Sequence, residues 1–122
     1  MRRHTLKLVE LAHQDGDYTF HLVVDDEDRP VKVRLGGWRG KPKSGILEPF
    51  ILEPDGVIDF GEVEGDGLDY ARHDRRGQTD ILDDKIRTGQ KVTVAFSQSK
   101  VALTITRIED LLGSGIKAKL AT

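Results

Sequence analysis

Apolar residues that recur at every second position are the feature that most restricts the fold of this chain. In the clearest example, Tyr18, Phe20, Leu22 and Val24 alternate with Thr19, His21, Val23 and Asp25. A period of two is typical of a half-buried β-strand, because successive side chains of a strand point to opposite faces of the sheet. The chain has no amphipathic helical pattern of useful length, so we expect a mainly β fold.

Two parts of the chain are predicted to form antiparallel hairpins. The first part, residues 5–35, predicts a three-stranded meander with strands at 5–11, 18–24 and 31–35. Asp15-Gly16 suits the first tight turn, and a polar run that ends in Pro30 suits the second. Residues 91–108 predict a second hairpin, because apolar residues alternate on both sides of the polar turn 97–100.

The stretch between these hairpins, residues 36–77, has a different composition. It holds nine of the thirteen glycines and three of the four prolines, which predicts a loop-rich arm. Its apolar residues are too numerous for a free linker, so we expect one or two short strands that fold against the core. Short helical turns are expected at 79–86, before Gly89, and at 109–112.

Together these elements predict a small antiparallel barrel or sandwich of about five to seven strands, with a glycine-rich central arm and at most short helical turns. The chain has 122 residues, which fits one domain, since domains most often have about 100–150 residues. We expect a single β-rich domain at residues 1–112 and a polar C-terminal tail at residues 113–122. The pattern leaves open whether the strands close into a barrel or pack as two sheets.

The chain contains no cysteine, which excludes a disulfide framework, thiolate metal sites and a cysteine nucleophile. No stretch approaches the roughly 18 apolar residues of a membrane helix. The basic start, Met1-Arg2-Arg3, leads into an alternating segment and not into the apolar run of a signal peptide. We therefore expect a soluble protein of the cytoplasm. The four histidines show no paired metal spacing and the acidic turns do not follow the calcium-loop order, so we expect no metal and no other cofactor.

Charge is sorted into blocks along the chain, although the net charge is only −2. Residues 29–43 carry six bases and no acid, and residues 44–71 carry eight acids and no base. Blocks of one sign create local fields that steer and orient partners. Either the two blocks neutralise each other within one fold, or a block of one molecule meets the opposite block of another.

Two short motifs that could indicate nucleotide chemistry lack the surroundings that such chemistry needs. Asp59-Phe60-Gly61 spells the magnesium-binding tripeptide of protein kinases, but a kinase needs a much larger domain with a separate lysine strand and catalytic loop. The segment 36–42 resembles a phosphate loop, but its glycine spacing is too short and Pro42 stands where a hydroxyl residue is required. No nucleophile with an adjacent base is indicated, so we expect no enzyme and no small-molecule substrate.

The basic loops support one alternative, a small β-barrel that binds nucleic acid or another anionic ligand. In loop 34–43 glycines permit close backbone approach, bases supply charge and Trp38 offers a stacking face, as in single-strand nucleic-acid binders. Loop 72–76 would extend this patch if the two loops are neighbours. The acidic block between them opposes phosphate binding unless it faces away. The candidate residues are Arg34, Trp38, Arg39, Lys41, Lys43, Arg72, Arg75 and Arg76.

The sorted charge and the lack of site motifs favour a non-catalytic protein-interaction or assembly module, which binds a protein partner or copies of itself. The acidic candidates for this contact are Glu48, Asp59, Glu62 and Glu64. Complementary fields contribute mainly to specificity and association rate, and apolar residues contribute more of the affinity. In overall style the chain looks like accessory components of phage particles, contractile machines and toxin–immunity pairs, which implies a structural component or an inhibitor. This similarity concerns only the general pattern of short β segments, long loops and a polar tail, and it rests on no motif.

Overall fold

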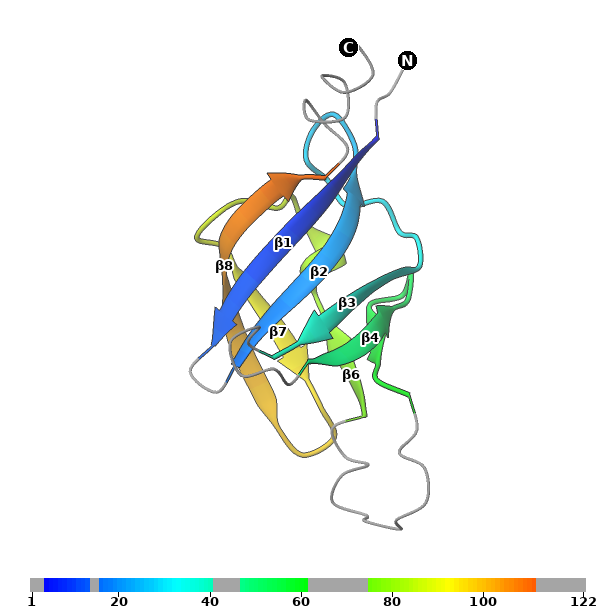
Figure 1. Ribbon diagram of the computed structural model, residues 1–122, viewed down its shortest axis with the longest axis vertical. Helices are drawn as coiled ribbons and strands as arrows, with labels where there is room; N and C mark the ends of the chain where they lie inside the picture. Colours follow the sequence, from blue (N-terminus) through cyan, green and yellow to red (C-terminus); the bar gives the residue numbers. More distant parts are fainter. Residues whose placement is uncertain (1–3, 14–15, 41–46, 62–74, 112–122) are drawn as a thin grey trace.

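The computed structural model describes residues 4–13, 16–40, 47–61 and 75–111. Eight antiparallel strands form a closed barrel, in which each strand pairs with the next and the last pairs with the first (Figure 1). The strands are β1 (Thr5–His13), β2 (Gly16–Val24), β3 (Leu35–Arg39), β4 (Glu48–Leu52), β5 (Val57–Asp59), β6 (Arg76–Thr79), β7 (Lys91–Ala95) and β8 (Lys100–Asp110). The mainly β, antiparallel fold is confirmed as a barrel, and the predicted number of five to seven strands was too low.

The additional strands lie in the glycine-rich window 36–77 or at its end, where one or two short strands were predicted. β4, β5 and β6 have 5, 3 and 4 residues. A strand of three to five residues shows at most two alternations, so its period is hard to distinguish from chance. The turn between β4 and β5 contains Gly56, whose φ of 89° is accessible to glycine at little cost. Residues 41–46 and 62–74 of the predicted arm lie outside the described residues.

The third strand was predicted at 31–35, but β3 spans Leu35–Arg39. Its pairing with β2 begins where Gly37 lies opposite Phe20. Residues 31–34, before that point, form no regular strand: Val31 donates its backbone N–H to Val23 O at 2.7 Å, and Val33 donates to Val31 O at 2.9 Å. Alternating apolar residues at 31–35 were therefore not enough to define a strand, because the regular pairing with β2 is made by residues 37–39. The helical turn predicted at 109–112 was also wrong over its described part, because β8 continues to Asp110.

Side chains from all parts of the barrel fill its interior. The buried apolar residues are Val9, Leu11, Tyr18, Phe20, Leu22, Val24, Phe50, Leu52, Ile58, Phe60, Ile81, Leu82, Ile86, Val92, Val94, Leu103 and Ile105. Burial of one such large side chain contributes about 1.5–3 kcal/mol. The aromatic rings form a chain of contacts, with centroid distances of 5.1 Å from Phe20 to Phe50 and 5.4 Å from Phe50 to Phe60. These rings extend the core towards the end of the barrel at which β3 finishes.

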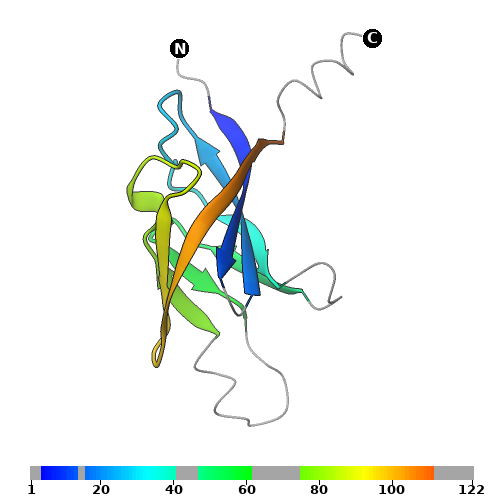
Figure 2. The ribbon, with the colours of Figure 1, turned by 90° about the vertical axis from the view of Figure 1, so that its left-hand side faces the viewer.

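The opposite end of the barrel is closed by the segment between β6 and β7 (Figures 1 and 2). This segment begins with a short 3-10 helix, η2 (Ile81–Asp83), where a helical turn was predicted. Ile81 and Leu82 are buried, as is Ile86, whose backbone N–H donates to Asp28 O at 3.0 Å and so joins this segment to the loop that follows β2. No helix within the described residues is long and apolar enough to cross a membrane.

Candidate interaction surface

The basic and acidic blocks meet on the β3–β4 hairpin. Antiparallel pairing places Arg39 directly opposite Glu48, and the Arg39 Nη2 atom lies 3.0 Å from Glu48 Oε1. Near the other end of the hairpin, Arg34 Nε lies 2.7 Å from Glu53 Oε1. Opposite charges on facing positions of antiparallel strands attract each other. The two charge blocks follow each other in the sequence and contain the two strands of one hairpin. Antiparallel pairing therefore brings basic residues of the first block next to acidic residues of the second.

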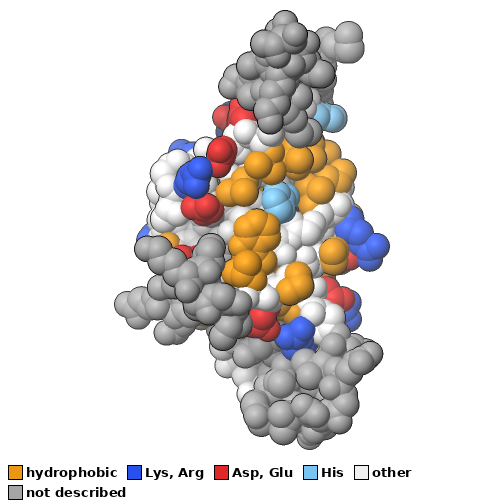
Figure 3. Space-filling model, viewed as in Figure 1, with side chains coloured by type: hydrophobic (Ala, Val, Ile, Leu, Met, Phe, Trp, Pro, Cys, Tyr) orange, Lys and Arg blue, Asp and Glu red, His pale blue; other side chains and the backbone are white. Residues whose placement is uncertain are grey.

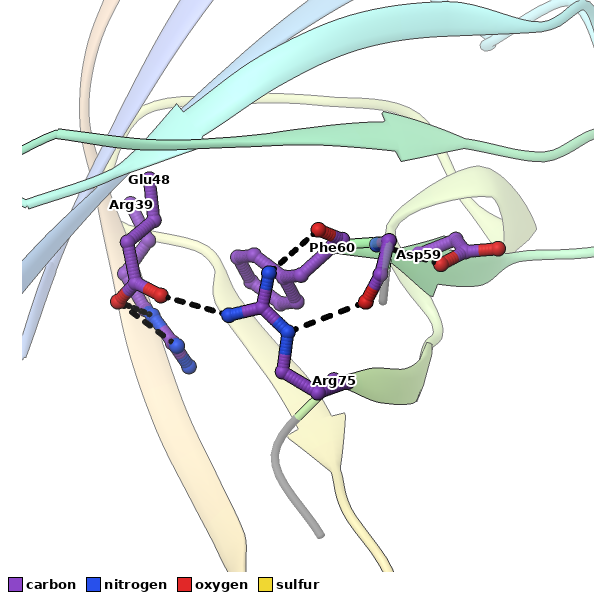
Figure 4. A network of polar contacts seen from close by, with 6 residues as sticks. Arg39, Glu48, Asp59, Phe60 and Arg75 are labelled. Carbon is purple, nitrogen blue, oxygen red and sulfur yellow. Dashed lines mark hydrogen bonds and ion pairs between the residues drawn. The ribbon is translucent and has the colours of Figure 1, made fainter. Parts of the chain in front are cut away.

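The second basic loop joins the same network through Arg75 (Figure 4). Its guanidinium donates from Nη1 to Glu48 Oε2 at 2.9 Å, from Nε to Gly61 O at 3.1 Å and from Nη2 to Phe60 O at 2.5 Å. The described parts of the two basic loops are thus neighbours, with the Glu48 carboxylate between their arginines. Arg75 also holds the chain on the two sides of residues 62–74 together.

The network closes one end of the barrel with charge lying against aromatic rings. The Arg39 guanidinium lies 4.2 Å from the centre of the Phe60 ring, and that of Arg75 lies 5.6 Å from it. Burial lowers the pKa of Arg39, but interactions with Tyr18 and Glu48 raise it more, so this pKa lies above its ordinary value. Arg39 therefore stays charged at any physiological pH. The arrangement offers several hydrogen bonds between charged groups and backbone carbonyls, which suits a structural latch.

We expect the substitution Glu48→Gln to lower the free energy of unfolding by about 1 kcal/mol, because it removes a carboxylate shared by two arginines. Arg39 and Arg75 have side chains only 22% and 21% exposed, so water replaces the lost partner poorly. The matched control is Glu53→Gln, whose partner Arg34 is 71% exposed and whose loss should stay below about 0.5 kcal/mol. Urea unfolding followed by fluorescence measures both, and equal losses would contradict the shared-latch description.

The outer face of β1–β4 carries an apolar surface, which we call the apolar strip. It consists of Leu6, Leu8, His21, Val23, Trp38, Pro49 and Ile51, which alternate with the buried residues of the same strands. The strand register brings them together, since Leu8 lies opposite His21 and Trp38 lies opposite Pro49. Figure 3 shows apolar side chains across this face with a histidine among them. Ile51 is 41% exposed, a high value for a large apolar side chain.

His21 and Trp38 hold each other in place within the apolar strip. Their ring centres are 5.4 Å apart in an edge-on arrangement. His21 Nδ1 lies 2.8 Å from Gly36 O, and because a carbonyl oxygen only accepts, Nδ1 carries the hydrogen and donates it. Trp38 is thus half-buried and packed against His21, and aromatic side chains of this kind are common anchors of protein interfaces.

The remaining predicted site residues lie either in other contacts or outside the described residues. Arg76 lies beside Asp59, with 3.7 Å between Nε and Oδ2. Asp59 also accepts the Gly61 backbone N–H at 2.8 Å, so the Asp-Phe-Gly sequence forms a turn after β5. Within the part of the chain that the structure describes, no group of three or more His, Asp or Glu side chains could hold a metal ion. The predicted candidates outside the described residues are Lys41, Lys43, Glu62, Glu64 and Arg72.

Sequence reasoning missed the apolar strip, although a signal for it was present. Leu6 and Leu8 alternate with Val9 and Leu11 in a strand that is apolar on both faces, whereas a strand with one solvated face is usually polar there. The opposite charges of β3 and β4 could also have suggested a hairpin.

Comparisons with family models, with curated proteins and with solved structures find no match to this chain.

Proposed function

We propose that this chain is a non-catalytic protein-interaction module, which binds a partner protein or a further copy of itself through the apolar strip. The observation that carries the proposal is an apolar surface across four adjacent strands, on the outside of a barrel whose interior is already filled. Contiguous exposed apolar surface on a water-soluble domain commonly marks an interaction site. The module would serve as a structural component of an assembly or as an inhibitor of its partner.

The sorted charge has a secondary role in this proposal. Arg34 and Arg39 already have acidic partners within the chain, which weakens the version in which whole blocks of two copies attract each other head to tail. Arg34 and Arg76 have side chains 71% and 72% exposed and can still attract an acidic partner. Exposed charges of this kind act mainly on the association rate. As part of the proposal we place the binding event in the cytoplasm, in keeping with the absence of cysteine.

We expect Ile51→Asp to abolish partner binding without unfolding the protein, because it places a charge in the apolar strip at an exposed position. The test compares proteins captured from the native host by the wild type, by Ile51→Asp and by the control Ala102→Asp. Ala102 is exposed on β8, away from the strip. The captured protein is then purified, and its affinity for all three is measured by calorimetry.

The self-association version is tested by size exclusion with light scattering, over a range of protein concentrations and at low and high salt. A concentration-dependent dimer that Ile51→Asp abolishes supports it. A monomer under all conditions contradicts self-association. If Ile51→Asp and Ala102→Asp bind the purified partner equally well, the apolar strip is not the contact surface and the proposal fails.

One observation favours the alternative of an anionic ligand. Arg39 and Arg75 lie together at one end of the barrel, with a single carboxylate between them. Against this alternative, most of their donors are engaged with Glu48 and with backbone carbonyls. The single tryptophan reports on the region, so single-stranded DNA at low salt should quench its fluorescence if this alternative holds. No quenching and no mobility shift would reject it.

A further inference from the structure

A small pocket adjoins the apolar strip on the outer face of the barrel. Its volume is about 220 Å³, and it runs across β8, β1, β2 and β3. The side chains that matter here are Glu10, Ala12, Asp17, Thr19, Trp38 and Thr106. Within this pocket Thr19 lies between Glu10 and Trp38, its partners on β1 and β3, and Ala12 lies opposite Asp17. Trp38 belongs both to the pocket and to the strip, so a partner on the strip reaches the pocket directly.

The charged groups that line this pocket are acidic. Asp17 and Glu10 contribute carboxylates, and none of the pocket residues within the described parts of the chain is basic. The Asp17 carboxylate has no hydrogen bond or ion pair to any described residue. Glu10 accepts from Arg107 Nη1 at 3.3 Å, but Arg107 also donates to Glu109 at 2.6 Å and is shared between the two acids. Among the residues that the structure describes, the pocket and its rim therefore carry a net negative charge.

The volume of the pocket and its tryptophan further restrict which chemical groups can bind there. Small-molecule sites usually have volumes of about 300–1,000 Å³, so a pocket of about 220 Å³ fits one long side chain better than a whole ligand. A tryptophan face attracts a cation, and Trp is the strongest of the aromatic residues in this respect. The hydroxyls of Thr19 and Thr106 can accept further N–H donors. Carboxylates, a tryptophan wall and hydroxyl acceptors together suit a guanidinium or an ammonium group.

From this geometry we propose that the pocket of Glu10, Asp17 and Trp38 receives an arginine or lysine side chain of the protein partner that covers the apolar strip. This inference rests on the proposed function and adds the chemistry of the partner: an apolar contact segment with one basic residue beside it. The apolar strip supplies buried area, and the pocket fixes the register of the partner through one charged, directional contact.

The test uses N-acetyl-arginine amide as the probe and observes the indole N–H of Trp38 by NMR of the full chain. N-acetyl-citrulline amide is the matched neutral probe, because it keeps the length of arginine and removes its charge. We expect the Trp38 signal to shift in a saturable manner with the arginine probe, and the citrulline probe to bind at least tenfold more weakly. Sodium chloride at matched ionic strength controls for screening. Equal binding of the two probes, or no saturable shift, overturns the proposal.

Variants then assign the contact to this pocket. Asp17→Asn and Glu10→Gln should each weaken binding of the arginine probe at least fivefold, and Asp83→Asn, an exposed acid in η2, should leave it unchanged. Equal effects of all three would indicate non-specific attraction and overturn the proposal. The chain's own Lys41 and Lys43 follow Gly40 of the pocket. If only the double variant Lys41→Gln/Lys43→Gln binds the probe, the pocket holds one of these lysines, which also overturns it.

The outcome is separable from that of the proposed function. Ile51 lies in the apolar strip and does not line the pocket. If Ile51→Asp abolishes partner binding while the arginine probe fails to bind, the interaction module stands and only the basic side chain is wrong. If the probe binds and Ile51→Asp has no effect on the purified partner, the pocket does bind a basic side chain, but the apolar strip is not the contact surface and the proposed link between the two sites is wrong.

Discussion

Replacing Gly37 with alanine is expected to lower the free energy of unfolding by about 3 kcal/mol, at the upper end of the usual range for overpacked cores. A Cβ atom at this position would lie 2.3 Å from Thr19 O and 2.6 Å from Phe50 Cζ. The first contact is with the backbone of a paired strand and the second is with a buried ring, so neither can move aside freely. Urea unfolding of the two proteins measures the difference.

Gly36→Ala is the control for this experiment, because Gly36 is the preceding residue of the same strand. Its Cβ would lie 3.7 Å from Phe50 O, an ordinary contact. Alanine also reduces the freedom of the unfolded chain, so the change should stay within about 0.5 kcal/mol of the wild type. A Gly37→Ala protein as stable as Gly36→Ala would show that β2, β3 and β4 pack less closely than described.

The second large effect is expected for Phe50→Ala, which should lower the free energy of unfolding by about 3–5 kcal/mol. Phe50 is 3% exposed and contacts three aromatic rings, those of Tyr18, Phe20 and Phe60. Its removal leaves a cavity, and the neighbouring rings can fill this cavity only if the backbone that carries them shifts. Ile51→Ala is the control, since Ile51 is the next residue and points outward; its loss should remain below about 1 kcal/mol. Similar losses for the two variants would contradict the inward position of Phe50.

Gly37 and Phe50 form one packing unit, and their substitutions should not be additive. They face each other across β3 and β4, and the Phe50 ring occupies the space that a side chain at position 37 would need. In the double variant the contact with the ring disappears while the contact with Thr19 O remains. The combined loss should therefore be smaller than the sum of the single losses, which a double-mutant cycle tests.

The two long N-terminal strands and the hairpin of β7 and β8 were predicted well from the sequence, and the short strands of the glycine-rich window were not. β1 and β2, with 9 residues each, contain enough alternations to establish a period of two. β5 has 3 residues, and its place in the sheet depends on pairing with β6 across residues 62–74. Such pairing is decided by tertiary packing, which no local pattern reveals. Closure into a barrel depends on the pairing of β1 with β8. The sequence therefore left the choice between a barrel and a sandwich undecided for the same reason.

The candidate site could also be predicted only in part, because its contacts depend on strand register. The charged residues were identified from their sorting, but the sequence gives no register, and register decides that Arg39 meets Glu48. Trp38 was selected for a stacking role beside basic residues, whereas its described neighbours include His21, the apolar strip and the acidic pocket. The strip requires knowledge of which face of each strand points inward. That assignment follows only when all strands share one core.

The seam between β1 and β8 has a consequence for how the protein is made. Lys7 pairs with Asp110, and Leu11 pairs with Ile105, so the barrel closes only by joining the first strand to the last. During synthesis β1 emerges from the ribosome long before its partner exists. Until then β1 exposes one hydrogen-bonding edge together with the apolar residues of both of its faces, a combination that invites pairing with other chains. The nascent chain is thus most vulnerable just before its last strand emerges, and premature termination upstream of β8 should yield aggregates in place of a truncated barrel.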